Sequence, residues 1–297
     1  MKPKSPILPR NAKDPTGIDR IERGAIREFR RRMRRVLKGY IQLLNRMPVE
    51  PTINKRYQFL LDAALLNMAL IEIDQLITEA LLEDDGHWFF DAYVSVAYAR
   101  GTAQEFSNLS QQSPSYKAGR MDLAALLRSE PYRRRLALLR AREFEEMEGL
   151  SGQVKANMNR VLLDGLGRGM SPRDIAKNLT SQVGIEERRA NRIARTEIPT
   201  ALRRARWDES EDAQDRYGLK GKQMHLSALS PTTRATHAGR HAKLYTTEQV
   251  REWYSVDGNS INCKCNQVFV LVDGKGRPLV STIQERAQAA LDKYEKE

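Results

Sequence analysis

The sequence is poor in cysteine and aromatic residues, and it has no long apolar run. Only 2 of its 297 residues are cysteine and 7% are aromatic, so a scaffold held together by several disulfides is excluded. The most apolar stretch, residues 59–82, contains four acidic side chains, and its longest uncharged run covers only residues 63–71. Because a membrane-spanning helix needs about 20 apolar residues, we expect no membrane span.

Several signatures of enzymes and of secreted proteins are also missing. The sequence has no Walker loop, no serine nucleophile elbow and no dinucleotide-binding glycine pattern. Its first residues combine prolines with lysines and lack the apolar segment of a signal peptide. We therefore expect a protein that is made in the cytoplasm and is not an enzyme.

Positive charge is concentrated near the N-terminus. Residues 1–60 contain 16 Lys and Arg residues against 5 Asp and Glu residues, whereas the remaining residues contain 34 against 33. Apolar residues recur at helical spacing over residues 17–47, and nine cations occupy the other faces of this predicted helix. The face is either an ordinary solvated surface or one that binds phosphate or an acidic protein, since such a density of like charge repels itself without a partner. The residues expected to make such a contact are Arg27, Arg30, Arg31, Arg34, Arg35 and Lys38.

The N-terminal half is predicted to be helical after a short arm. Residues 1–16 contain four prolines, and we expect a flexible, extended arm. Residues 17–150 form the predicted helical region. Its helix at 53–82 is apolar nearly all round, which predicts the buried centre of a bundle. Small residues in the helix at 88–109, such as Gly101, would let a neighbouring helix approach closely.

The C-terminal half is predicted to be a mixed domain, residues 151–273, followed by a charged helix, residues 274–297. Glycines near residue 167 and Gly184 are expected to separate three helices before residue 216. Strands are expected at 222–229 and 267–272, where apolar β-branched residues recur. The predicted fold class is α+β, mainly α: a long helical N-terminal region followed by a small mixed α/β C-terminal module.

One group of side chains has the chemistry of a metal site, namely His237, His241, Cys263 and Cys265. Two imidazoles and two thiolates are a tetrahedral set that suits structural zinc. A Cys-x-Cys pair faces opposite sides of a strand, so both thiolates could reach one metal only in a turn. The alternatives are reduced packing cysteines beside a locally hydrogen-bonded His237, or a metal used in hydrolysis. We expect structural zinc as the possible cofactor and no other.

Four short blocks occur in order between residues 159 and 272. They are a glycine turn into a capped helix at 167–176, an Arg-Thr-Glu block at Arg195, Thr196 and Glu197, an Arg-x-x-His block at Arg234 and His237, and the block Asn262, Cys263, Lys264 and Cys265. Together they resemble the Mu F-type phage head morphogenesis family. Three positions depart from the pattern of that family: Ser230 replaces a usual Asp, His225 lies near a common Trp, and Lys264 replaces Arg.

The resemblance implies a minor structural protein of a phage head, located in the virion near the portal vertex and associated with packaged DNA. The expected partners are the portal and other head proteins, with double-stranded DNA as a further candidate. Two alternatives remain: a DNA-binding protein ejected with the genome, or a metal-dependent hydrolase or nuclease. Arg195 and Glu197 are expected to form ion pairs, and Arg234 either an internal salt bridge or a phosphate contact.

Overall fold

The computed structural model describes residues 4–52, 54, 56–83 and 87–294. It is mainly helical with small sheets, which confirms the predicted fold class. The chain divides into two compact units, and each is built from separate stretches of sequence. Unit 1 takes residues 1–22, 93–139 and 195–297, and unit 2 takes residues 23–92 and 140–194. None of the described helices is long and apolar enough to cross a membrane.

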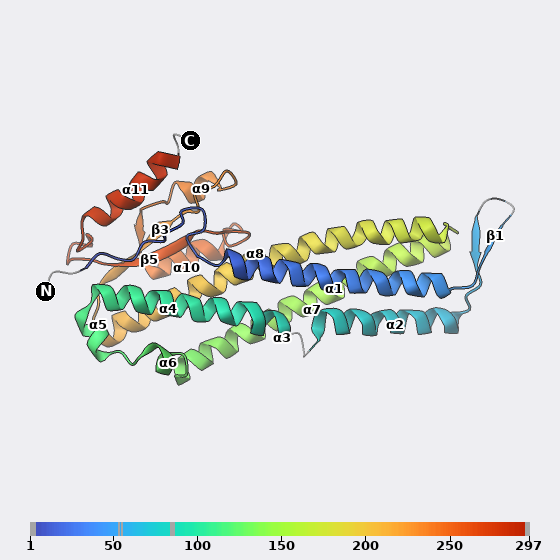
Figure 1. The fold of residues 1–297 in the computed structure, drawn as a ribbon, viewed down its shortest axis with the longest axis horizontal. Helices are drawn as coiled ribbons and strands as arrows, with labels where there is room; N and C mark the ends of the chain where they lie inside the picture. The colour runs from blue at the N-terminus through green and yellow to red at the C-terminus, as the bar shows by residue number, and fades with distance from the viewer. Residues whose placement is uncertain (1–3, 53, 55, 84–86, 295–297) are drawn as a thin grey trace. The chain divides into compact units, whose positions relative to one another are not determined.

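Unit 2 is a bundle of long helices. In Figure 1, α1 (Asp19–Arg46) and α2 (Ala63–Leu82) run beside the unit 2 parts of α7 (Glu130–Gly167) and α8 (Pro172–Tyr217). The buried stripe of α1 follows the helical period predicted from the sequence and comprises Ala25, Phe29, Met33, Val36 and Tyr40. The Tyr40 hydroxyl donates a hydrogen bond of 2.7 Å to Asn159 Oδ1 on α7, which gives this buried aromatic side chain a polar partner.

The second predicted helix begins ten residues later than expected, because two short strands precede it. Strand β1 (Val49–Pro51) pairs antiparallel with β2 (Tyr57–Phe59). Asp62 then caps α2 by accepting a hydrogen bond of 2.8 Å from the Leu65 backbone nitrogen. The prediction that this helix is buried on all sides is wrong: one face is buried, while Leu65, Met68 and Ile71 are 46–67% exposed.

The two longest helices run through positions where the sequence predicts a boundary, namely Gly184 and residue 150. Helix α8 continues without a break across Gly184, because a buried stripe carries on through that position. The stripe comprises Ile175, Leu179, Val183, Glu186, Ala190 and Ala194. Likewise α7 crosses residue 150 along its own buried stripe, which comprises Met147, Leu150, Val154, Met158 and Leu162. Tertiary packing therefore outweighs the cost of about 1 kcal/mol for a helical glycine.

The second stretch of unit 1 begins at Tyr93, within the π-helical segment (Phe90–Val94) that follows α3 (His87–Phe89). The serine-rich run at 110–119 favours a loop but is helical: α4 (Ser95–Gln112) leads through Ser113 directly into α5 (Pro114–Gly119), and α6 (Leu123–Leu126) follows. Ser113 makes this possible because its hydroxyl caps α5. The predicted close approach occurs at Gly101, whose added Cβ would lie 2.3 Å from the Leu202 carbonyl oxygen of α8.

A three-stranded antiparallel sheet forms the mixed part of unit 1. Its order is β4 (Leu244–Tyr245), β3 (Gly221–Leu226) and β5 (Asn266–Leu271). The remaining helices are α9 (Ala235–Ala238), α10 (Thr247–Ser255) and α11 (Thr282–Tyr294). One face of the sheet buries Val268 and Val270 against Ile283 of α11. The other buries Phe269 with Leu109 of α4 and Ala213 of α8, as the alternation of a two-sided strand requires.

The N-terminal segment is extended, as expected, but the expectation of a flexible arm is wrong for its described residues. Ile7 donates its backbone N–H to Asn108 Oδ1 at 3.0 Å, and Leu229 donates its backbone N–H to the Ala12 carbonyl at 3.0 Å. Asn266 Nδ2 donates to the Pro15 carbonyl at 2.9 Å. The prolines hold the chain extended, and its backbone groups are bonded by side chains and loops of unit 1.

Candidate metal centre

Cys263 and Cys265 lie in the turn that leads into β5. Residues 263–265 belong to no strand, and Asn262 immediately before them adopts a left-handed φ of 52°. An asparagine tolerates this conformation better than most residues do. Because the backbone turns here, the two side chains escape the opposite orientations of a regular strand. The geometric condition that a Cys-x-Cys metal pair requires is therefore met.

His237 lies against both thiols. Its Nδ1 atom is 3.4 Å from Cys263 Sγ and 3.5 Å from Cys265 Sγ. The three ligand atoms lie within 4.8 Å of one another, and the three residues are only 2–3% exposed. His237 lies on the short helix α9, and its ring packs edge-on against the Trp253 ring with 4.6 Å between the ring centres. Three of the four predicted ligands are thus brought together.

His241 does not belong to this cluster, so the predicted four-ligand set is wrong at this position. Its Nδ1 accepts hydrogen bonds from the Ser227 backbone N–H at 3.2 Å and from the Ser227 hydroxyl at 2.8 Å. Its Nε2 donates to the Ala287 carbonyl of α11 at 2.9 Å. The stretch after α9 is a turn rather than a continued helix. The two histidines therefore do not share a helix face, and His241 fastens α11 instead.

A buried arginine supports the cysteine turn from α8. Arg203 is fully buried, and its Nη1 donates to the carbonyls of Cys263 at 2.9 Å and Cys265 at 3.2 Å. Its Nη2 donates to Thr200 Oγ1 at 3.0 Å, and its guanidinium lies 4.4 Å from the centre of the Tyr254 ring. A guanidinium with this fixed geometry can hold two carbonyl groups at once. The backbone of the turn is therefore fixed on both sides of Lys264.

Two residues of the sequence motifs hold the preceding turn. Arg234 donates to the carbonyls of Gly258 at 3.0 Å, Asn259 at 2.9 Å and Ile261 at 3.2 Å. Thr196 Oγ1 accepts the backbone N–H of Asn262 at 3.2 Å. Arg234 therefore bonds backbone carbonyls instead of forming the expected internal salt bridge, and its expected contact with phosphate stays a prediction.

The other motif residues on α8 lie at the edge of the same site. Arg195 is half exposed, and its Nε lies 3.5 Å from Glu22 Oε1, which Lys264 approaches at 3.7 Å. Burial raises the pKa of Glu22, and the two cations oppose that shift. Glu197 is 6% exposed on the next face of the helix. The predicted ion pair of Arg195 is present, with Glu22 as its partner.

The cluster opens onto a pocket of about 600 Å³ in unit 1. Its lining includes the three candidate ligands, Glu22, Arg195 and Arg234, together with hydroxyl groups of the loop before α9. Six of the eight motif residues predicted from the sequence lie in this lining, namely Arg195, Arg234, His237, Asn262, Cys263 and Cys265. Three of the four motif blocks, which extend from residue 195 to residue 265, therefore meet at one place.

The two thiols are electrostatically unequal. The pKa of Cys263 is well below that of a free thiol, because Cys265 and His237 hydrogen-bond its thiolate and Arg203 supplies positive charge, although burial opposes the shift. The pKa of Cys265 is raised because it donates its proton toward Cys263 and is buried. Hydrogen bonds and the charge of Arg203 therefore favour the thiolate form of Cys263, and a thiolate is the form that binds metal.

A stripe on α8 was not singled out in the sequence. The residues facing the turn and the sheet are spaced by three or four positions and comprise Thr196, Thr200, Arg203, Trp207 and Ser210. Trp207 Nε1 donates to Gln267 Oε1 at 3.1 Å, and Gln223 Nε2 donates to Ser210 Oγ at 2.8 Å. This spacing marks one helix face. It was visible in the sequence, but its polar members do not register in a search for apolar periodicity.

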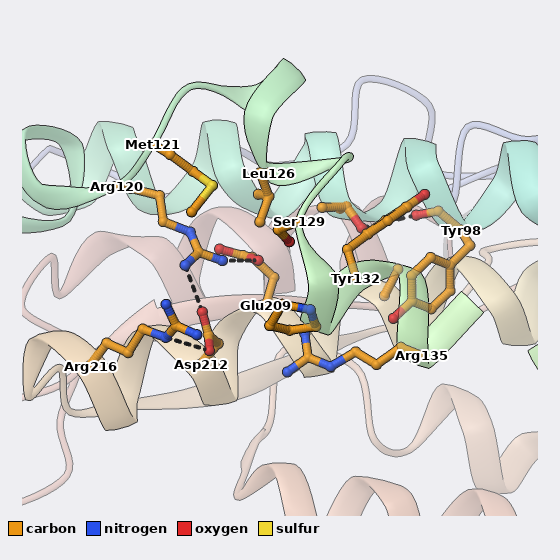
Figure 2. Close-up of a pocket in the computed structure, with 13 residues that line it drawn as sticks. Tyr98, Arg120, Met121, Leu126, Ser129, Tyr132, Arg135, Glu209, Asp212 and Arg216 are labelled. Atoms are coloured by element: carbon orange, nitrogen blue, oxygen red, sulfur yellow. Dashed lines mark hydrogen bonds and ion pairs between the residues drawn. The ribbon is translucent and has the colours of Figure 1, made fainter. Parts of the chain in front are cut away.

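A second cavity in unit 1, of about 70 Å³, is lined by charged groups that neutralise one another. Figure 2 shows Arg120 pointing toward Glu209 and Asp212, with distances of 2.9 and 2.7 Å, and Arg216 reaching Asp212 at 2.9 Å. The Tyr116 hydroxyl donates to Glu209 at 2.5 Å. These pairs fasten the segment around Arg120 to α8, and the cavity offers little room for a ligand.

The cations predicted for nucleic-acid or portal contact all lie on exposed positions of α1. They are Arg27, Arg30, Arg31, Arg34, Arg35 and Lys38. Arg30 lies 3.7 Å from Glu187, and Arg31 pairs with Glu28. Arg32, in contrast, is buried, bonds Glu28 and Glu83, and lies 4.2 Å from the centre of the Trp88 ring. Arg32 is thus a structural member of the bundle.

Comparison with known proteins places His237, Cys263 and Cys265 inside a segment that matches a family model. Residues 156–268 match the model of the family described as Phage Mu protein F like protein. An uncharacterized protein of Haemophilus influenzae is 26% identical over 206 residues, which cover 67% of this chain and 43% of that protein. The chain therefore spans less than half the length of that relative. No solved structure matches the chain.

Proposed function

We propose that the protein is a minor structural protein of a phage head, because residues 156–268 match the model of the phage Mu protein F-like family. It acts in head morphogenesis and is carried in the virion. The family match is the observation that carries this proposal. The matched segment covers the end of α7, the whole of α8 and the sheet up to β5.

The motif side chains support a structural role for the matched segment. Arg234 and Thr196 bond the backbone of the turn before Cys263, and Arg203 bonds the carbonyls of the two cysteines. A side chain that donates its hydrogen bonds to backbone groups of the same chain stabilises the local fold rather than binding a substrate. We therefore propose that the matched segment forms a docking surface within the head and does not take part in catalysis.

We place the protein near the portal vertex, with other head proteins as partners. The exposed apolar residues Leu65, Met68 and Ile71 of α2 support such a contact, because they form neighbouring positions of one helix face. Contiguous apolar residues at a surface are typical of protein interfaces. This contact would bury the face that the sequence predicts to be buried.

Genetic complementation tests this proposal. In a phage genome that encodes this chain with its gene interrupted, we expect few DNA-filled heads, and the wild-type gene supplied in trans should restore them. The readout is the ratio of filled to empty heads in purified particles. A normal ratio from the interrupted genome would contradict a role in head morphogenesis.

A second activity, contact with packaged DNA, is favoured by the exposed face of α1. Arg27, Arg31, Arg34 and Lys38 are spaced by four, three and four residues, so they share one stripe of about 16 Å. Cations at such a density bind phosphates and release counterions, which makes the affinity depend steeply on salt.

Replacing these four cations by Gln should lower the slope of log affinity against log salt by about three to four for double-stranded DNA. The matched control removes four other exposed cations of unit 2, namely Arg160, Arg168, Arg173 and Lys177. We expect the control to retain most of the slope. An equal loss in both variants would mean that net charge alone, and not the α1 stripe, attracts DNA.

A further inference from the structure

The distances around His237 fit those of a metal site. A tetrahedral zinc ion with Zn–S bonds of about 2.3 Å and a Zn–N bond of about 2.0–2.1 Å places nitrogen and sulfur about 3.6 Å apart. The two distances from His237 Nδ1 to the sulfurs are 3.4 and 3.5 Å. All three ligand atoms lie within 4.8 Å of one another, so one ion can reach them with little movement.

Neighbouring side chains also hold the three ligands in fixed positions, as metal binding requires. Carbonyls on both sides of Lys264 are bonded by the buried Arg203, and the preceding turn is bonded by Arg234. The imidazole ring is fixed by Trp253. Groups that orient the ligands from outside contribute strongly to metal affinity. Two sulfurs and one nitrogen are the donors that select zinc over the hard cations magnesium and calcium.

The fourth position differs from that of a closed structural zinc site. His241, the remaining candidate, is bonded to Ser227 and Ala287 through both ring nitrogens. The three ligands instead line the pocket of about 600 Å³. Sites with three protein ligands and one position facing a pocket exchange solvent or bind an external ligand there.

We propose that His237, Cys263 and Cys265 bind one Zn²⁺ ion whose fourth position opens to this pocket and accepts solvent or a small anion. The ion joins α9 to the turn before β5, so it fixes a small module whose apolar core is limited. The ion also places a Lewis acid in the wall of the pocket. The proposed role in the head does not require such a group.

The first test is metal content, measured by mass spectrometry on the full chain purified without chelator from zinc-supplemented cells. We expect about one zinc per chain, and background levels in His237→Ala, Cys263→Ser and Cys265→Ser. The matched control is His241→Gln, which should keep the metal because this side chain bonds Ser227 and Ala287 and not the cluster. Background zinc in the wild type, or loss of zinc from a folded His241→Gln protein, would overturn the three-ligand assignment.

The second test uses only the wild-type chain, so it holds even if the cysteine variants do not fold. After exchange of the metal for Co²⁺, the spectrum should contain a thiolate-to-cobalt charge-transfer band and the strong visible bands of a tetrahedral ion. Addition of azide should shift the visible bands, because the anion replaces solvent at the fourth position. A spectrum without the thiolate band overturns the site, and a spectrum that azide leaves unchanged overturns the open position.

Discussion

Arg203 shows how single residues shape the candidate site. This buried cation bonds the carbonyls of both cysteines and lies beside the Tyr254 ring. The presence of Cys263 and Cys265 could be read from the sequence, but their side chains converge only because such residues hold the turn. Three of the four predicted ligands meet. The fourth, His241, could not be excluded in advance because nothing in the local sequence reveals its contact with Ala287.

His241 should make stability sensitive to acid. Burial lowers the pKa of this histidine, and its Nδ1 faces donors from Ser227, so a second ring proton would meet N–H and O–H groups. The folded protein therefore binds the proton less readily than the unfolded chain does. Stability should be complete above about pH 6.5, the ordinary pKa of the unfolded histidine, and should fall as the pH decreases below that value.

Urea unfolding at a series of pH values checks this expectation. His241→Gln keeps a donor for the Ala287 carbonyl but cannot be protonated, so it should lose less stability than the wild type below about pH 6.5. Because His241 bonds Ala287 of α11, that helix should unfold first, and the helical signal in circular dichroism should begin to fall at lower urea concentrations in acid. Identical acid dependence in the two proteins would contradict the role assigned to His241.

At the scale of elements, the contact between α4 and α8 depends on the absence of a side chain at Gly101. An added Cβ would lie 2.3 Å from the Leu202 carbonyl oxygen and 2.9 Å from Ala205 Cβ. Gly101→Ala should therefore lower the free energy of unfolding by about 1–3 kcal/mol, because the helices must separate. Chemical denaturation followed by circular dichroism measures the change.

The matched control is Gly149→Ala in α7, where an added Cβ meets nothing within 4 Å. This substitution should stabilise the helix by about 0.5–1 kcal/mol, since alanine restricts the unfolded chain and favours the helix. A loss of stability from Gly149→Ala, or none from Gly101→Ala, would mean that the helix contacts are misassigned.

The type of most elements could be predicted from the sequence, but their ends could not. Helix α1 and strands β3 and β5 lie where apolar periodicity places them. The breaks expected at Gly184 and near residue 150 do not occur, because buried stripes run through them and packing outweighs local propensity. The hairpin before α2 was also missed, since the apolar run continues through its second strand.

The N-terminal segment was misjudged for a related reason. Its prolines do prevent helix and strand formation, but the bonds that hold it come from Asn108, Leu229 and Asn266. These residues are about 100 to 250 positions away in the chain, and no local pattern indicates them. Local sequence therefore predicts that a segment is extended, but not whether it is packed.

At the scale of the whole molecule, two separate features support one proposed role. One unit carries the basic stripe and the exposed apolar face, on α1 and α2. The other carries the pocket with His237, Cys263 and Cys265. Separate surfaces proposed for DNA, for other head proteins and for a metal ion suit an assembly component better than a single-substrate enzyme.

The most direct measurement of the central claim is the number of copies of this chain in purified phage heads. Quantitative mass spectrometry against isotope-labelled peptides of this protein and of the major head protein gives that number. The account predicts that the chain is present at a constant level of a few copies per head and remains after the particles are washed in high salt. Its absence from purified heads, or a variable level removed by washing, would contradict the assignment as a minor structural protein.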